Sequence, residues 1–412
     1  MKETKQKGAA LIIFAVIFAL AATAFLISQL DASGVKIERD KKTSLALAEA
    51  KVALIGSIVG TNNIAEPTYL PNPDLKLSPV IPEGSESGDL GASDISLIGK
   101  FPWYSLGVSP LRDGWNECLW YVVSGRFKKS PHSSVFNWDT QGQITVVNEN
   151  GNTVASNLAA LIISPGAILA GQDRKLAPDT PQCGGNYDAK NYLDAYNSTN
   201  AVAGEVNYFE GSTNSRLAPN DNDKTFVLAQ NDFYNDQFSF VTVDEIFIPI
   251  IRRSDFANQI DALLNDADLI SIANEIAITS LTTTPPNPSN LKGTGNLELD
   301  CGCVIPNCAT QKIISNADNQ KFCENWRDML LLTQLPSAST IKINGVDTSC
   351  NRLLIFGGQK TVAQARITTA NRSAPANYLE DNLSAFIASS ADFEGMSKFN
   401  ANNPSADILK CI

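Results

Sequence analysis

Histidine is nearly absent from this chain, and its scarcity limits the chemistry that the protein can perform. The 412 residues contain one histidine, His132, within a Ser-Pro-His-Ser-Ser stretch that is typical of a surface loop. Neither a Ser-His-Asp triad nor a Cys-His pair can be assembled without this residue. The sequence also has no P-loop and no glycine-rich dinucleotide-binding motif. We therefore expect no enzymatic activity and assign no catalytic residue.

Charged residues are also few, at 18% of the chain, and acidic ones outnumber basic ones to give a formal net charge of -11. Nucleic-acid affinity depends on cationic side chains that neutralise phosphates, so this balance disfavours a nucleic-acid partner. The hydrophobic content of 43% is enough for one large or two moderate globular domains.

Ionisable side chains are missing altogether from residues 9–30, which follow Lys2, Lys5, Lys7 and Gly8. As a helix this segment is about long enough to cross the ~30 Å hydrocarbon core of a bilayer. The preceding lysines favour a cytoplasmic N-terminus and an exported remainder. The segment fits a secretory signal cut near Ala19–Ala21, a plain membrane anchor, or a short leader cut after Gly8.

A second helical pattern follows over residues 36–59. Five apolar residues there recur at three- and four-residue spacing and share one face, which we expect to contact a globular head: Leu45, Ala48, Val52, Ile55 and Val59. We predict one helix over residues 9–60, ended by Gly60.

The predicted fold class is α+β, with a long N-terminal transmembrane and stalk helix followed by a β-rich head made of two related subdomains. The predicted divisions are a leader over 1–8, the helix over 9–60, a Pro- and Gly-rich extended linker over 61–100, a first head subdomain over 101–281, a linker over 282–300 and a second, disulfide-rich head subdomain over 301–412. Within the first subdomain, residues 238–253 predict a strand and residues 255–277 a helix.

The eight cysteines are an even number, which in an exported chain predicts disulfides: Cys118, Cys183, Cys301, Cys303, Cys308, Cys323, Cys350 and Cys411. We expect Cys118 to pair with Cys183 and the group from Cys301 to Cys323 to pair locally. Zinc is the alternative for that group, but its spacing is not that of a paired C-x-x-C site and no histidine is near, so we assign no metal ligand.

Repeated sequence elements are the strongest internal signal in the head. Residues 161–174 (LIISPGAILAGQDR) and 353–366 (LLIFGGQKTVAQAR) both place an apolar run before a glycine and a Gln-x-Arg. Asn191-Tyr-Leu-Asp194 matches Asn377-Tyr-Leu-Glu380, and each copy has an upstream hairpin pattern around Asn-Gly. An apolar segment farther upstream in each copy, CLWYVVS and WRDMLLLTQL, is the fourth element, and four elements in the same order indicate an internal duplication.

Three groups of side chains are candidates for ligand binding. The repeated Gln-x-Arg and Asn-Tyr-Leu elements fit a ligand site, but tying loops together through backbone hydrogen bonds is the preferred interpretation. The oxygen-rich loop Asn220–Asp223 offers ligands for calcium without the full EF-hand spacing. Trp103, Tyr104, Trp115 and Trp120 fit a carbohydrate-stacking patch, although core packing is favoured. No cofactor is assigned.

The N-terminal residues KQKGAALIIFAVIFAL resemble the leader of type IV pilins and pseudopilins. The resemblance implies cleavage by prepilin peptidase between Gly8 and Ala9 and assembly with other subunits through the N-terminal helix. Major pilins carry glutamate at the fifth mature position, where its carboxylate neutralises a neighbour's N-terminal amine. This chain has Ile13 there, which argues against a repeating shaft subunit.

The segments FPWYSLGVSPLRDGWNECLWYVVSG, VTVDEIFIPIIRR, LIFGGQ and PANYLE resemble pilin-like proteins of Gram-negative bacteria. The resemblance implies a minor pilin or pseudopilin that primes or caps a pilus or a type II secretion pseudopilus. It implies an inner-membrane location with a periplasmic head before assembly, and a periplasmic or cell-surface filament afterwards. The alternative is a stably membrane-anchored periplasmic ligand-binding protein.

Overall fold

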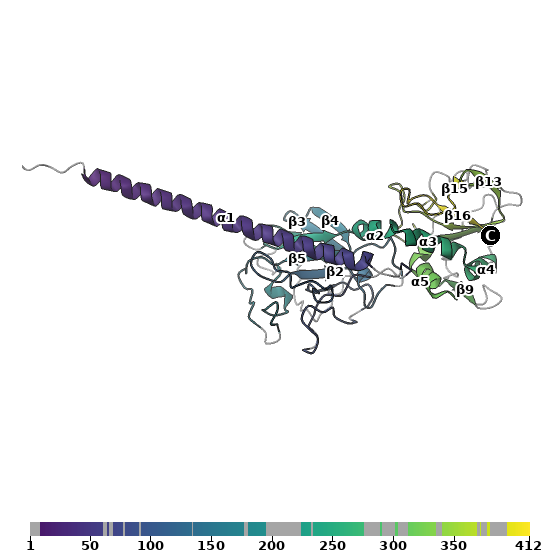
Figure 1. The fold of residues 1–412 in the computed structure, drawn as a ribbon, viewed down its shortest axis with the longest axis horizontal. Coiled ribbons are helices and arrows are strands. Elements are labelled where there is room, and N and C mark those ends of the chain that lie inside the picture. Colours follow the sequence, from purple (N-terminus) through teal and green to yellow (C-terminus); the bar gives the residue numbers. More distant parts are fainter. Residues whose placement is uncertain are drawn as a thin grey trace, which may run out of the picture.

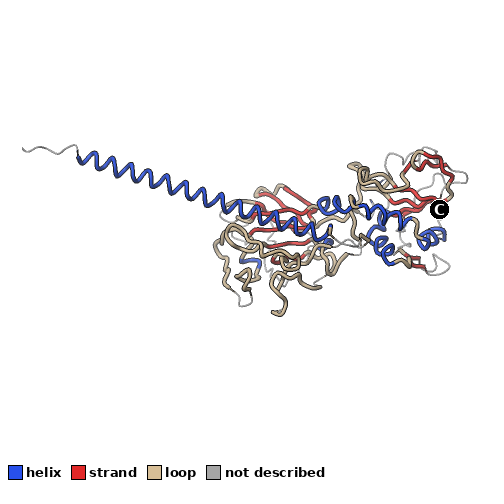
Figure 2. Tube along the Cα trace, in the orientation of Figure 1, coloured by secondary structure: helices blue, strands red, loops and turns tan. Residues whose placement is uncertain are grey.

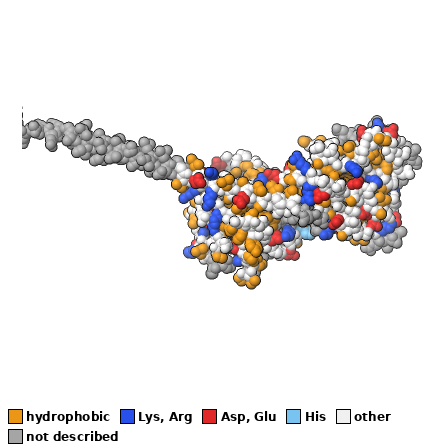
Figure 3. Space-filling model, viewed as in Figure 1, with side chains coloured by type: hydrophobic (Ala, Val, Ile, Leu, Met, Phe, Trp, Pro, Cys, Tyr) orange, Lys and Arg blue, Asp and Glu red, His pale blue; other side chains and the backbone are white. Residues whose placement is uncertain are grey.

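The computed structural model shows a long helix that leads into two lobes (Figure 1). We call residues 64–241 the first lobe and residues 254–412 the second lobe; a waist separates them in the space-filling view (Figure 3). The side chains of the long helix are described from Gly34 onward. The described residues are 9–60, 64–65, 69–76, 79–89, 92–133, 135–176, 180–194, 224–231, 234–275, 289–290, 301–303, 312–334, 340–368, 371, 377–379 and 394–412.

The N-terminal helix α1 spans Ala9–Val59. Where its side chains are described it carries charged residues, among them Lys36, Glu38 and Arg39. No helix in the described part of the chain is both long and apolar enough to cross a membrane. This finding contradicts the predicted fold class with its transmembrane helix. The fold described here is α+β with a β-rich body, and the described part of its N-terminal helix is not apolar.

The face of α1 that packs on the first lobe includes only part of the predicted one: Ile55 and Val59 pack half-buried against the core, whereas Leu45 and Val52 do not. Its buried residues are Thr43, Ala46, Leu47, Ala50, Leu54 and Ile58. Leu45 and Val52, from the predicted stripe, are instead 62% and 71% exposed. Both sets have helical spacing, so the pattern alone could not choose between them. The small side chains of Ala46 and Ala50 lie on the face that contacts β5 and β7, where they allow a close approach.

The central sheet of the first lobe has the strand order β1-β2-β5-β7, with every neighbouring pair antiparallel. Side chains alternate between its two faces, so that Tyr121 and Val123 pack on the α1 side and Trp120 and Val122 on the other. Both faces are covered, which explains why β2 and β5 are continuous buried runs. Their bounds are β1 (Leu97–Lys100), β2 (Trp120–Val123), β5 (Ala160–Ser164) and β7 (Gln237–Val241).

A smaller sheet of order β4-β3-β6 packs on the face away from α1. β3 and β4 form the hairpin predicted from Asn150-Gly151, and Gly151 has the positive φ of 76° that such a turn needs. β6 pairs in parallel with β3. Their bounds are β3 (Ile144–Asn148), β4 (Thr153–Leu158) and β6 (Lys224–Leu228).

The second lobe repeats the topology of these two sheets and adds the two-stranded sheet of β9 and β10. Its central sheet has the order β8-β11-β14-β16, again antiparallel throughout, and its smaller sheet has the order β13-β12-β15, with β15 parallel to β12. Figure 2 shows one group of strands in the first lobe and another in the second lobe. The bounds are β8 (Ser289–Asn290), β9 (Gly302–Cys303), β10 (Lys312–Ile313), β11 (Leu330–Gln334), β12 (Thr340–Ile343), β13 (Val346–Ser349), β14 (Arg352–Phe356), β15 (Glu394–Gly395) and β16 (Ile408–Cys411).

Helices fill the space between the sheets and differ from the sequence-based prediction. Residues 238–253 were predicted as one strand, but the strand β7 ends at Val241 and α2 begins at Val243, because Thr242 and Glu245 form a capping box. The single helix predicted over 255–277 is two helices, since the Asp266 carboxylate accepts hydrogen bonds from the Asp268 and Leu269 amides and starts a new one. The bounds are α2 (Val243–Ile251), α3 (Ser254–Leu264), α4 (Ala267–Glu275), α5 (Ala317–Trp326), and the short 3-10 helices η1 (Gly125–Phe127), η2 (Ala189–Asn191) and η3 (Arg327–Met329).

Segments that the sequence assigned to linkers or to the first subdomain contribute to other parts of the fold. β1 lies within the predicted linker 61–100, and β8 lies within the predicted linker 282–300. α3 and α4 fall inside the predicted first subdomain, 101–281, yet α3 contacts α5 and β14, and α4 contacts β9 and β10. α3 therefore packs on the second sheet as α1 packs on the first.

The two lobes share one hydrophobic core. Trp138, from the connection between β2 and β3, inserts into the second lobe and packs edge-to-face against Trp326 at 4.6 Å between ring centroids. The Asn137 amide donates to the Asn325 carbonyl at 2.9 Å, and the Arg253 guanidinium donates to the Val59 carbonyl at the end of α1 at 2.6 Å. These contacts fix the lobes and α1 in one arrangement.

Candidate functional site

The first Gln-x-Arg element forms a network that closes the loop after β5. The Arg174 guanidinium donates to the carbonyls of Gly166 and Asn191 at 3.0 Å and to the Gln172 amide oxygen at 2.8 Å. It also lies over the Tyr192 ring, 5.0 Å from the centroid. The Asn191 side chain accepts from the Asp173 amide at 3.1 Å. The repeated side chains therefore bind one another and the local backbone.

The second element forms the same network with the equivalent residues. The Arg366 guanidinium donates to the carbonyl of Asn377 and, at 2.9 Å, to that of Gly358, and it lies 4.4 Å from the centroid of the Tyr378 ring. The Asn377 side chain accepts from the Ala365 amide at 3.1 Å. The preferred structural interpretation of the repeats is confirmed for these described residues, because the arginine donors are occupied by protein acceptors.

The carboxylate that neutralises each arginine comes from a different source in the two lobes. Glu117, which directly precedes Cys118 and β2 of the same lobe, lies 3.2 Å from Arg174. The position equivalent to Glu117 in the second lobe holds Asp328, as judged from the paired registers of β2 with β5 and β11 with β14. Arg366 is instead paired with Asp139 of the first lobe, also at 3.2 Å. One lobe thus completes the arginine site of the other.

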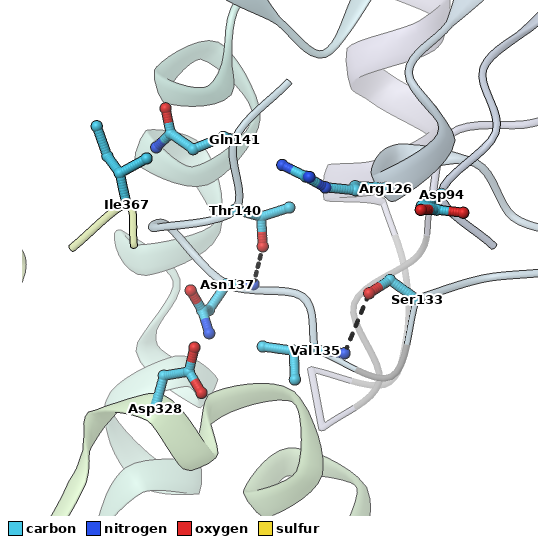
Figure 4. Close-up of a pocket in the computed structure, with 9 residues that line it drawn as sticks. All are labelled: Asp94, Arg126, Ser133, Val135, Asn137, Thr140, Gln141, Asp328 and Ile367. Carbon is cyan, nitrogen blue, oxygen red and sulfur yellow. Dashed lines mark hydrogen bonds between the residues drawn. The ribbon is translucent and has the colours of Figure 1, made fainter. Parts of the chain in front are cut away.

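A hollow of about 360 Å³ lies at this junction (Figure 4). The first lobe lines it with Asp94, Arg126 and residues of the connection between β2 and β3, and the second lobe lines it with Asp328 and Ile367. Several of its polar groups already bind protein atoms: Thr140 accepts from the Asn137 amide, and Ser133 accepts from the Val135 amide. The hollow is polar and presents both charge signs.

The face of α1 that turns away from the head carries apolar and small residues beside the exposed charged side chain of Glu49. Leu45 and Val52 are mostly exposed, Ala48 between them is also exposed, and a side-chain carbon placed at Gly56 meets no atom within 4 Å. We call Leu45, Ala48, Val52 and Gly56 the outward stripe. The Lys51–Glu245 ion pair at 2.5 Å and the buried face hold α1 on the head, so the outward stripe is presented on a fixed scaffold.

The cysteines form disulfides where their side chains are described. Cys118 bonds to Cys183, as predicted, and Cys301 bonds to Cys323 within the group expected to pair locally. Cys350 bonds to Cys411, which fastens β16 at the C-terminus to the short connection between β13 and β14. Cys308 and the side chain of Cys303 lie outside the described residues, and no described cysteine is free. The pair Cys301–Cys323 commits two of the four candidate zinc ligands to a disulfide.

The remaining predicted positions are not gathered into a site. His132 is stacked on Tyr69 with ring centroids 4.8 Å apart. Trp120 is buried and Trp115 packs under Arg39, so the four aromatic residues form no common patch. Gly8 and the loop Asn220–Asp223 lie outside the described residues, and Ala9 is the first residue of α1. Among the described side chains, no cluster of three or more His, Cys, Asp or Glu suited to a metal ion is found.

Buried charges that the sequence analysis missed lie beneath the first lobe's loops. Lys100 donates to the Gly184 carbonyl at 3.1 Å and lies over the Tyr187 ring, 4.3 Å from its centroid. Burial lowers the pKa of Lys100 to about 8, and burial raises the pKa of the neighbouring Asp74, which accepts from the Tyr187 hydroxyl at 2.6 Å. These residues come from segments far apart in the sequence, so no local pattern marks them.

Comparison of the chain with protein-family models, with curated proteins and with solved structures finds no match.

Proposed function

We propose that this protein is a minor pilin or pseudopilin, a structural and interaction subunit that primes or caps a type IV-like filament. The observation that carries the proposal is the outward stripe of α1. Apolar side chains exposed in a row on a helix are a docking face for another helix, because burying them removes apolar area from water. The head occupies the opposite face, so α1 can contact the head and neighbouring subunits at the same time.

The sequence supports the same assignment in two ways. Residues 9–30 continue α1 toward its N-terminus without an ionisable side chain, which suits a bundle of similar helices in a filament core. The leader-like residues up to Gly8 make prepilin peptidase the processing partner. We propose that the head lies in the periplasm, at the inner membrane before assembly and on a periplasmic or cell-surface filament afterwards, where its disulfides persist.

Charge introduced into the outward stripe tests the proposal. Leu45→Glu combined with Val52→Glu should abolish incorporation into sheared filaments, because two carboxylates would have to be buried without partners between helices. Ser44→Glu is the control, since Ser44 is also exposed on α1 but lies outside the stripe. Immunoblots of sheared filaments and of whole cells measure incorporation and total protein. Normal incorporation of the double variant at normal abundance would contradict the proposal.

Ligand binding at the lobe junction is the second candidate function, and the hollow in Figure 4 is the observation that favours it. Arg126 on one side and Asp328 on the other suit a small zwitterion. Thermal unfolding in the presence of each free amino acid provides the test. A rise in the unfolding midpoint of the wild type that is absent in Arg126→Ala would favour a ligand-binding protein. Unchanged midpoints would count against ligand binding and favour the filament subunit.

A further inference from the structure

Two buried aspartates hold each other's backbone in the first lobe. Asp194 follows the Asn191-Tyr192-Leu193 turn, and Asp236 directly precedes β7. The Asp194 carboxylate accepts from the backbone amides of Asn235 and Asp236 at 2.5 and 2.6 Å. The Asp236 carboxylate accepts from the Asp194 amide at 3.0 Å. Each side chain therefore depends on the position of the other.

Both residues are 1% exposed, and each uses only one carboxylate oxygen in these bonds. The other oxygen of each, Oδ1, is buried and receives no hydrogen bond from any described residue. Two ionised carboxylates in this setting would repel each other with no donor on their free oxygens, which is unfavourable in a buried site.

The charged groups around the pair do not neutralise it. Arg174 is the nearby cation, but its donors are occupied by Glu117, Gln172 and three or more backbone carbonyls. Asp113 is a further carboxylate on the same side and adds repulsion to Asp236. Burial raises the pKa of Asp194 to about 7. Burial also raises the pKa of Asp236, and the charge of Asp194 raises it further.

The equivalent aspartate of the second lobe has a different backbone partner. Asp407 precedes β16 as Asp236 precedes β7, and its carboxylate accepts from the Gly358 amide at 3.1 Å. In the first lobe the equivalent glycine, Gly166, donates to Asp113 at 3.0 Å, while Asp236 accepts from the Asp194 amide.

We propose that at least one of Asp194 and Asp236 is protonated at neutral pH and that the two form a pH-sensitive clamp between the Tyr192 turn and β7. While the proton is present, the pair carries at most one charge and the reciprocal backbone bonds hold. When it leaves at alkaline pH, repulsion between two buried charges loosens the turn and, with it, the Arg174 network that the turn supports.

Thermal unfolding of the full chain in EDTA from pH 5 to 8.5 tests the clamp. The folded state holds a proton that the unfolded chain releases near pH 4, so the folded-to-unfolded ratio should fall with rising pH, by up to about tenfold per unit for one proton, until the pair has lost its protons above neutral pH. Asp236→Asn should remove this dependence, because an amide at this position is neutral at every pH. Asp173→Asn is the exposed control and should behave as the wild type does.

Hydrogen exchange gives a local readout that a general loss of stability does not reproduce. Peptides covering residues 187–194 and 234–241 should lose protection as the pH rises in the wild type and retain it in Asp236→Asn, or in Asp194→Asn if that variant folds better. An equal pH dependence in wild type and both variants would overturn the proposal. So would Ca²⁺, added in place of EDTA, restoring the wild type but not the variants at pH 8.5, since a cation would then hold the pair.

Discussion

Asp139 in the first lobe and Arg366 in the second form a buried ion pair, with 3.2 Å between Oδ2 and Nη1 and side chains that are 3% and 1% exposed. Lys360 lies farther from the same carboxylate, at 3.7 Å. The pair lies beside Trp138, which packs into the second lobe, so charge and apolar burial act at one point of the junction. Loss of Asp139 removes the carboxylate that pairs with the buried guanidinium of Arg366.

Asp139→Ala should therefore lower the free energy of unfolding by about 3–5 kcal/mol, the range expected when one partner of a buried pair is removed. Replacing both residues, with Asp139→Ala and Arg366→Met together, should cost less than the two single changes combined. Urea unfolding followed by tryptophan fluorescence measures the change. Asp173→Ala, from the exposed Lys175–Asp173 pair, should alter stability far less, because solvent screens an exposed pair. A similarly small effect of Asp139→Ala would contradict a tightly joined pair of lobes.

Part of this fold could be predicted from the sequence because the signals are local. Apolar runs mark β5 and β14, and the Asn-Gly dipeptides mark the two hairpins, where Gly151 and Gly345 have the required positive φ. The repeated order of motifs agrees with two sheets of the same strand order. In each case the residues that form the element also carry its signal.

The junction could not be predicted because its residues lie in an irregular connection whose partners are far along the chain. Nothing around Trp138 and Asp139 distinguishes them from other loop residues until Trp326 and Arg366 are placed beside them. The buried face of α1 was in part predicted wrongly for a related reason. Two apolar stripes with helical spacing are present, and only the shape of the sheet decides which one is covered. The transmembrane assignment failed as well, since no described helix meets the requirements for a span.

Removal of the disulfide in the first lobe should destabilise the loops over β1. The Cys118–Cys183 bond joins the start of β2 to the segment whose Gly184 carbonyl accepts from Lys100. Cys118→Ser with Cys183→Ser should lower the free energy of unfolding by about 2–5 kcal/mol. Chemical unfolding of the purified double variant beside the wild type measures this difference. Alkylation of either cysteine in the native wild type without a reductant would show that the bond is not formed.

Stability should rise with pH above about 8 because of Lys100. Burial lowers the pKa of this amine from 10.5 to about 8, so the folded state releases the proton before the unfolded chain does. Below pH 8 the buried amine is charged and its full destabilising effect is present. Between pH 8 and 10.5 this effect disappears, so the folded-to-unfolded ratio should rise by up to about tenfold per pH unit. Urea unfolding at pH 7.5, 9 and 10 should show this rise in the wild type and not in Lys100→Met. Lys175→Met, at an exposed position, should retain it.

Processing at the N-terminus should leave Ala9 as the first residue of the mature chain. The basic leader ends in Gly8 directly before the apolar residues, and a small residue there suits a peptidase that cuts at the start of a helix. Gly8→Ala should be tolerated, whereas Gly8→Trp should block cutting. N-terminal sequencing of protein extracted from cells checks the prediction. A terminus at Met1 or near Ala22 would point to one of the other two interpretations of this segment.

The protein should occur in few copies at or near the tip of a filament. Ile13 removes the carboxylate that a shaft subunit uses to pair with a neighbour's amine, and an unpaired buried charge is unfavourable. The second lobe lies beyond the end of α1 (Figure 1), so a shaft of closely packed copies would have to accommodate two lobes per subunit. At a tip, one side of the head meets no further subunit and both features are tolerated. Immunogold labelling of sheared filaments should place the label at their ends. The wild-type chain should assemble with Ile13 in place, without the change Ile13→Glu. Dense labelling along the shaft, or a copy number equal to that of the main subunit, would contradict the tip assignment.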